Sequence, residues 1–134
     1  MSELNFLISP PGLEPLVDFS LVETDGAPGL YTMTATSEDG PRLYVLDAGL
    51  HLPRYQPTIS TEQCALLGLE AAEDASVLVV INPGEGEATT VNLLAPIVLN
   101  RTTGECAQLI LESQEWPLRA ELSTVAGQEP AGGR

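Results

Sequence analysis

Short extended runs separated by turn residues constrain the fold of this chain more than any other feature. Runs rich in apolar, aromatic and β-branched residues recur roughly every eight to twelve residues, a spacing typical of a β-sandwich or β-barrel. The runs that we expect to form strands are 4–8, 17–22, 30–36, 42–47, 75–81, 89–100, 106–111 and 116–122. The pattern predicts an all-β fold, a small barrel-like sheet with antiparallel or mixed pairing.

Turn residues mark where several of these strands end. Pro10-Pro11-Gly12 follows the first run, and proline cannot donate a hydrogen bond to a sheet. Residues 24–29 turn the chain before the third run, and Asp39-Gly40 accepts the positive φ angles of a tight hairpin turn. These signals predict where the strands end and a tight hairpin turn at 38–40.

One stretch, near residues 60–68, departs from the strand pattern and predicts a short helix. Ser60 and Gln63 have the spacing of a capping box, and Gly68 can take the left-handed conformation that ends a helix. A helix of about two turns is unstable alone, so we expect it to lie against the sheet.

The length of the chain allows one domain with a real core. A chain of 134 residues buries about 65–70% of its unfolded surface on folding. We expect a single domain over residues 1–123, because two domains would each be too small. Residues 124–134 have little to bury and predict a disordered tail.

The charge of the chain argues against nucleic acid as a direct partner. The formal net charge is −14, from 19 acidic and 5 basic residues, and there is no lysine. Nucleic acid binding needs a basic patch, whereas these arginines are scattered and the first 41 residues carry no basic side chain. An acidic surface can steer a basic protein toward it, although the charge can equally serve solubility alone.

The chain offers no constellation for catalysis, a metal or a cofactor, and we expect none of the three. His51 has no nucleophile motif near it, and Gly84-Glu85-Gly86-Glu87 lacks the lysine and spacing of a phosphate-binding loop. Cys64 and Cys106 lack the spacing of a metal site or a disulfide framework, so we expect them to be buried as small hydrophobes.

We expect a cytoplasmic protein without a membrane partner. No leader with a basic and then an apolar part is evident at the start of the chain. The longest apolar runs, such as 77–81, fall far short of the ~20 residues that span a bilayer.

The run 91–100 is uncharged, apolar and interrupted by Pro96. Proline in a central strand removes a sheet hydrogen bond, so Pro96 predicts an edge or a bulge. At an edge, exposed backbone beside Leu94, Ile97 and Val98 can accept a segment of another protein. The alternative is a barrel corner at which every apolar neighbour of the proline faces inward.

Residues 90–100 carry a resemblance to a known family. The string Thr90-Val91-Asn92-Leu93-Leu94-Ala95-Pro96-Ile97-Val98-Leu99-Asn100 resembles the signature TVNLxAPIxxN of the bacterial flagellar assembly factor family FliW, and Gln108-Leu109-Ile110-Leu111 resembles its trailing Q-x-x-L. Weaker similarity at 12–14, 19–21 and 52–55 extends the match over about residues 6–120. Leu13, Ala48 and Arg54 depart from the family, which commonly has a phenylalanine, a proline and an acid there.

The resemblance implies a small barrel-like protein that binds flagellin and, when free, the translational regulator CsrA. Free protein would relieve the repression of flagellin mRNA by CsrA. One alternative is a dedicated flagellin export chaperone without a regulatory role. A small-molecule-binding β-barrel is a further alternative, disfavoured because a barrel of this size is filled by its own side chains.

The resemblance also suggests which residues face a partner, namely the exposed members of 92–100 together with Tyr55. The expected contact residues are Tyr55, Asn92, Leu94, Pro96, Val98 and Asn100. The alternative for Asn92 and Asn100 is that their side chains only satisfy backbone groups at strand ends, a common use of asparagine.

Overall fold

The computed structural model describes residues 2–9, 13–36, 42–52, 55, 57–71, 74–82, 89–111, 116–117 and 119–122. The elements, in chain order, are β1 (Ser2–Phe6), β2 (Asp18–Glu23), β3 (Leu30–Ala35), β4 (Arg42–Asp47), α1 (Ala48–His51), α2 (Thr61–Leu66), β5 (Ala75–Asn82), β6 (Thr90–Val91), β7 (Ile97–Asn100), β8 (Glu105–Gln108) and β9 (Ala120–Glu121). The predicted all-β fold is confirmed.

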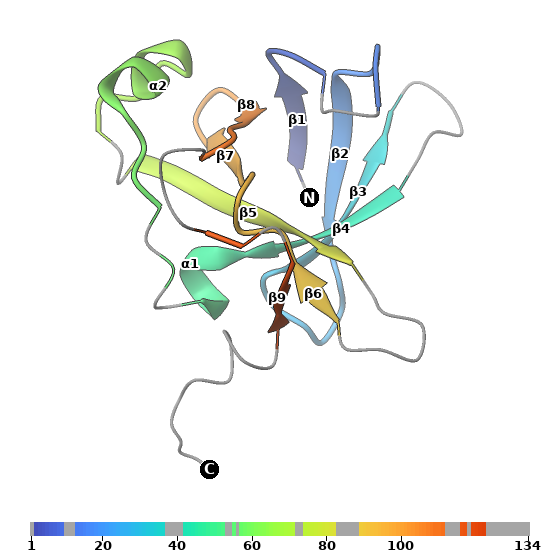
Figure 1. Cartoon of the computed structure of the whole chain (residues 1–134). Helices are drawn as coiled ribbons and strands as arrows, with labels where there is room; N and C mark the ends of the chain where they lie inside the picture. Colours follow the sequence, from blue (N-terminus) through green and yellow to red (C-terminus); the bar gives the residue numbers. More distant parts are fainter. Residues whose placement is uncertain are drawn as a thin grey trace.

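Seven of these strands close into a barrel (Figure 1). The sheet runs in the order β4-β3-β2-β1-β8-β7-β5, and a further pairing of β4 with β5 joins its two ends. The pairings are antiparallel except that of β1 with β8, which is parallel and sets Asn5 opposite Glu105. The pairing is therefore mixed, as predicted.

The eight-residue strand β5 connects the barrel to a small extension. One edge of β5 pairs with β4, and the other pairs with β7 along Ala75–Leu78 and with β6 at Ile81 and Asn82. β9 pairs with β6 outside the barrel. The two short strands β6 and β7 thus follow each other along the same edge of β5.

The expected single strand at 89–100 is wrong. Its ends form β6 and β7, while residues 92–96 between them leave the sheet. The reason is local, because Pro96 has no N–H to donate and the Asn92 side chain accepts the hydrogen bonds that would otherwise continue the ladder.

Of the two places considered for Pro96, a sheet edge and a barrel corner, the edge is excluded. β7 lies between β5 and β8, and Pro96 is fully buried. The structure supports the corner, with one change: Ile97 and Leu99 point into the barrel, whereas Leu93 and Val98 pack on its outer side.

The barrel interior is filled by alternate residues of the surrounding strands. Side chains at every second position point inward, as the two-residue period of a strand requires. They form one core cluster: Leu4, Phe6, Phe19, Leu21, Met33, Ala35, Val45, Leu78, Ile97, Leu99 and Cys106. The rings of Phe6 and Phe19 meet edge to face, with centroids 5.4 Å apart. Large side chains therefore occupy the interior, as expected for so small a barrel.

Two further clusters cover the outer side of β4, β5, β7 and β8. One lies around β4 and β5: Leu46, Ala48, Leu52, Tyr55, Val79, Ile81, Val91, Leu93 and Ala120. The other joins α2 to β7 and β8: Cys64, Leu67, Leu69, Val98, Ala107 and Leu109. Much of this half of the barrel wall is buried on both faces, apart from Tyr44 on β4, which is 40% exposed. Both cysteines are buried as predicted.

The predicted short helix is confirmed as α2. Ser60 and Gln63 form the expected capping box, and Gly68 has a φ of +72° just beyond the helix.

The one-turn helix α1 was not expected. The strands expected at 106–111 and 116–122 are shorter in the structure, and the one expected at 4–8 lies at Ser2–Phe6. The turn at 38–40 and the tail at 124–134 lie outside the described residues. No helix in the described part is long and apolar enough to cross a membrane.

Candidate protein-binding site

Asn92 folds the segment 92–96 into a compact turn. Its side-chain Oδ1 accepts hydrogen bonds from the backbone N–H groups of Leu94, at 3.1 Å, and Ala95, at 3.0 Å. The short asparagine side chain here replaces a backbone acceptor, which is how this residue stabilises turns. The N–H of Asn92 itself donates to the carbonyl of Val80, at 3.0 Å, so the turn stays anchored to β5.

The carbonyl groups of the same segment are also bonded. The Leu94 and Pro96 carbonyls accept from the backbone N–H groups of Leu111, at 2.8 Å, and Leu109, at 2.9 Å. The side-chain amide of Gln108 donates to the Ala95 carbonyl at 3.0 Å. Gln108 was not among the expected site residues, although its place in the trailing Q-x-x-L string is the signal that could have identified it.

Tyr55 supplies the remaining bond from a distant part of the chain. Its hydroxyl donates to the Leu93 carbonyl at 2.6 Å, and its ring meets Trp116 edge to face with centroids 4.7 Å apart. Burial raises the pKa of the Tyr55 hydroxyl well above its ordinary value, so the group stays protonated and can donate. Tyr55 therefore links the segment 90–100 to the cluster around β4 and β5.

Asn100 has a matching role at the other end of the segment. Its amide Nδ2 donates to the Leu67 carbonyl at 2.8 Å, and its Oδ1 accepts from the N–H of Thr102 at 3.0 Å. Asn100 is only 6% exposed, so these bonds are made in the interior. It ties the end of α2 to the turn after β7, as the alternative interpretation of the two asparagines expects.

The six expected contact residues expose little surface. Pro96 and Val98 are fully buried, and Tyr55 and Asn100 are less than a tenth exposed. Asn92 and Leu94 are half-buried and reach the surface in part. Direct contact with a partner by this segment is therefore confined to Asn92 and Leu94, and a role of the six residues in partner binding stays a prediction.

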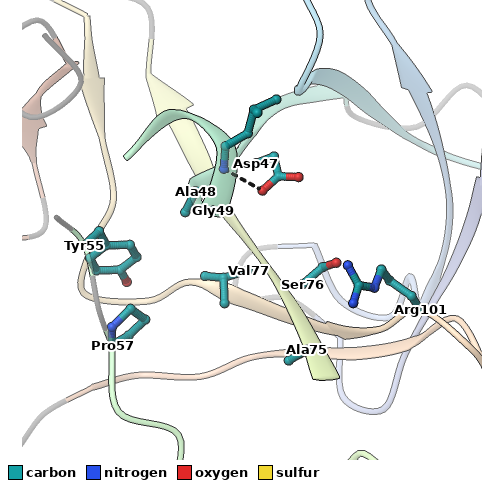
Figure 2. Close-up of a pocket in the computed structure, with 10 residues that line it drawn as sticks. Asp47, Ala48, Gly49, Tyr55, Pro57, Ala75, Ser76, Val77 and Arg101 are labelled. Atoms are coloured by element: carbon teal, nitrogen blue, oxygen red, sulfur yellow. Dashed lines mark hydrogen bonds between the residues drawn. The ribbon is translucent and has the colours of Figure 1, made fainter. Parts of the chain in front are cut away.

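A shallow groove of about 360 Å³ lies beside this region, between α1 and the first residues of β5. Figure 2 shows Tyr55 and Pro57 at one end, Arg101 at the other, and Val77 and Ser76 between them. Asp47 lines the rim, where its carboxylate accepts a hydrogen bond from the Leu50 N–H at 3.3 Å. Arg101, which directly follows the signature segment, was also not among the expected site residues.

The outer face of β1 and β2 is acidic and exposed. Asn5 pairs with Asp18 on one side and with Glu105 on the other, so two acids flank it in one cross-strand row. The Asn5 amide donates to the Asp18 carboxylate at 2.6 Å, and Glu3 lies two residues away on the same face. The strands β1, β2, β3 and β8 contain no basic residue. The negative charge of this face is therefore not balanced by a basic residue on any of these four strands.

Comparison with protein families gives a match over nearly the whole described chain. The model of the FliW protein family matches residues 4–122. A flagellar assembly factor FliW from Thermosipho africanus is 31% identical over 121 residues, which cover 89% of this chain and 83% of that protein. The flagellar assembly factor FliW from Thermotoga maritima is 33% identical over 117 residues, covering 84% and 77% of the two chains.

A solved structure has the same fold. The crystal structure of a flagellar assembly factor FliW superposes with a TM-score of 0.80 and covers 90% of this chain and 84% of the other. The sequence identity in this comparison is 19%, so the likeness concerns the fold.

Proposed function

This chain belongs to the FliW protein family, and from this membership we propose that it is a flagellar assembly factor that works as a protein-binding partner switch. It binds flagellin while subunits accumulate. Once flagellin is exported, the freed protein binds the translational regulator CsrA and relieves the repression of flagellin mRNA. Both events take place in the cytoplasm.

The observation that carries this proposal is the uneven covering of the barrel. The outer face of β4, β5, β7 and β8 is packed under α1, α2 and the outer clusters. The outer face of β1 and β2 is exposed and holds Glu3, Asp18 and, at its border with β8, Glu105. An exposed acidic sheet face suits a basic protein as partner, because complementary charge speeds association and favours binding.

The same face suggests how binding would antagonise an RNA-binding partner. An acidic surface held beside a basic RNA site raises the free energy of bringing phosphate groups to that site. The effect is screened by salt, with a Debye length of about 8 Å at physiological ionic strength. The protein therefore needs no contact with the RNA-binding residues themselves.

Calorimetry with flagellin and with CsrA, each alone and then in competition, tests the proposal. We expect binding to both, displacement of CsrA by flagellin, and a CsrA affinity that falls as salt is raised. Binding to flagellin without binding to CsrA would instead support a dedicated export chaperone. Binding to neither would overturn the proposed function.

A pair of matched variants tests the acidic face itself. Glu3→Gln combined with Glu105→Gln removes two charges from that face, and Glu62→Gln combined with Glu121→Gln removes two from exposed positions on α2 and β9. We expect the first variant to weaken CsrA binding about fivefold at low salt and the second to change it little. Equal losses would indicate a general effect of net charge and would overturn the assignment of the face.

A further inference from the structure

Arg101 stands at the junction of two surface hollows. One is the groove between α1 and β5 described above, and the other, of about 410 Å³, lies toward Gly68, Thr102 and Thr103. Arg101 lines both. Figure 2 shows it reaching toward Ser76, with the floor of the groove extending from there toward Tyr55. A ligand lying in either hollow would therefore lie beside the same arginine.

The backbone position of Arg101 is well defined. It follows the buried Asn100, whose Oδ1 accepts from the N–H groups of Thr102 and Thr103, at 3.0 and 3.4 Å, and whose Nδ2 holds the Leu67 carbonyl. A turn fixed in this way presents its first side chain from a rigid base, which lowers the ordering cost of binding.

The positive charge of the Arg101 guanidinium is available to a ligand. Although acids outnumber bases 19 to 5 in this chain, no carboxylate in the described residues forms an ion pair with exposed Arg101. Asp47 lines the same groove, and its carboxylate accepts a hydrogen bond from the Leu50 N–H while keeping its charge. Arginine is well suited to bind a carboxylate, because its planar fork can donate two parallel hydrogen bonds.

The rest of the groove is mainly apolar. Leu50 is 58% exposed, but its Cδ2 lies against Gly29 rather than in the groove, whereas Val77, Pro57 and Ala75 line it. These three side chains would be covered by an aliphatic side chain of a ligand, with the gain that burial of apolar surface gives.

We propose that this groove binds an extended segment of a partner protein that places a single carboxylate on Arg101 and an aliphatic side chain against Val77 and Pro57. The segment carries one acid rather than several, because Asp47, Glu70 and Asp74 line the two hollows and repel further negative charge. The proposal rests on the protein-binding role above and adds the chemistry that the partner presents.

Peptide titrations followed by ¹⁵N–¹H NMR of the full chain test it directly. The probes are three acetylated and amidated hexapeptides with an aspartate, an asparagine or a lysine between two leucines. We expect the aspartate peptide to shift the amides of Gly49, Ser76 and Arg101, and to bind about fivefold more tightly than the asparagine peptide. Equal affinity for the three peptides, or shifts confined to other parts of the chain, would overturn the proposal.

Two variants and a fourth peptide sharpen the test. Arg101→Gln should abolish the preference for aspartate, while Arg119→Gln, also exposed, should keep it. A peptide with three aspartates should bind no more tightly than the peptide with one. Retained preference in Arg101→Gln, or affinity that rises with each added aspartate, would contradict the assigned site.

The outcome can be separated from that of the proposed function. Flagellin and CsrA are titrated against the same Arg101→Gln protein. If the wild-type chain binds neither protein but retains the peptide preference, the partner switch fails and the groove stands. If both proteins bind the wild-type chain and the peptides are not distinguished, the groove fails alone.

Discussion

Tyr55 shows at the scale of one residue how a buried polar group can hold a turn in place. Its hydroxyl is the partner of the Leu93 carbonyl, which sits in the outer cluster. Tyr55→Phe leaves that carbonyl buried without a donor, so we expect a loss of about 1–2 kcal/mol in the free energy of unfolding. Urea denaturation measures the loss, and Tyr44→Phe, at a position 40% exposed, should change stability little.

The same variant bears on the expected contact role of Tyr55. If Tyr55→Phe weakens flagellin or CsrA binding only in proportion to its loss of stability, the tyrosine serves to stabilise the fold and does not contact the partner. A loss of binding at unchanged stability would contradict that role and would favour direct contact with the partner.

Cys106 gives a prediction on pH. Burial raises the pKa of its thiol from the ordinary value of 9.0 to about 12. The folded-state pKa is thus above the unfolded one, so the stability linked to the neutral thiol is complete below pH 9 and is lost as pH rises from 9 toward 12. Between pH 7 and about pH 10.5, the wild-type chain should lose about 2 kcal/mol more than Cys106→Ala, measured by urea denaturation. Parallel losses in the two proteins would contradict the raised pKa.

The sequence located the segment of the site better than it indicated what each of its residues contacts. The segment 90–100 was identified from its sequence, and the alternative in which its asparagines satisfy backbone groups agrees with their hydrogen bonds. The bond from Tyr55 to Leu93 spans 38 residues, and no local pattern indicates which distant side chain will meet a carbonyl. Burial of Pro96 and Val98 likewise depends on strands placed by the rest of the fold.

At the scale of elements, local signals predict a structure when they are complete within a few residues. α2 has a capping serine, a returning glutamine and a terminal glycine, and all three act as expected. α1 is one turn long, with Asp47 as its N-cap, and its buried residue Ala48 packs in the cluster around β4 and β5, so tertiary contacts add to a single local signal. An amphipathic pattern cannot develop over four residues, which is why the sequence does not reveal it.

The turn between β6 and β7 depends on one acceptor. Asn92→Ala removes the oxygen that binds the N–H groups of Leu94 and Ala95, so we expect a loss of about 1–2 kcal/mol in the free energy of unfolding. Asn92→Asp keeps an acceptor at the same place and should stay within about 0.5 kcal/mol of the wild type. Chemical denaturation of the three proteins makes the comparison. Equal stability of all three would show that the side chain does not hold the turn.

At the scale of the whole molecule, alternation predicted the class of fold but not the closure of the sheet. The pairing of β4 with β5 and the parallel pairing of β1 with β8 join segments far apart in the chain. Both depend on which faces the whole chain can bury together. The strand β5 shows the difficulty, because Leu78 points into the barrel while Val79 packs outside it, and a continuous apolar run does not tell the two faces apart.

The charge of the whole molecule makes a prediction of its own. A net charge of −14 on 134 residues repels itself, and Asp18 and Glu105, which flank Asn5, place two of these charges in one cross-strand row. Raising sodium chloride from roughly 20 mM to roughly 500 mM screens these charges, so we expect the melting temperature to rise by several degrees.

The position of a removed charge decides how the salt effect changes. Glu105→Gln should stabilise the protein at low salt and reduce its response to salt, because it relieves part of the repulsion across β1. Glu62→Gln removes the same charge from the first turn of α2, where an acid favours the helix dipole, and should not stabilise. Thermal unfolding of the three proteins at both salt concentrations measures these effects. A melting temperature indifferent to salt, or equal stabilisation by both variants, would show that the acidic row does not strain the barrel.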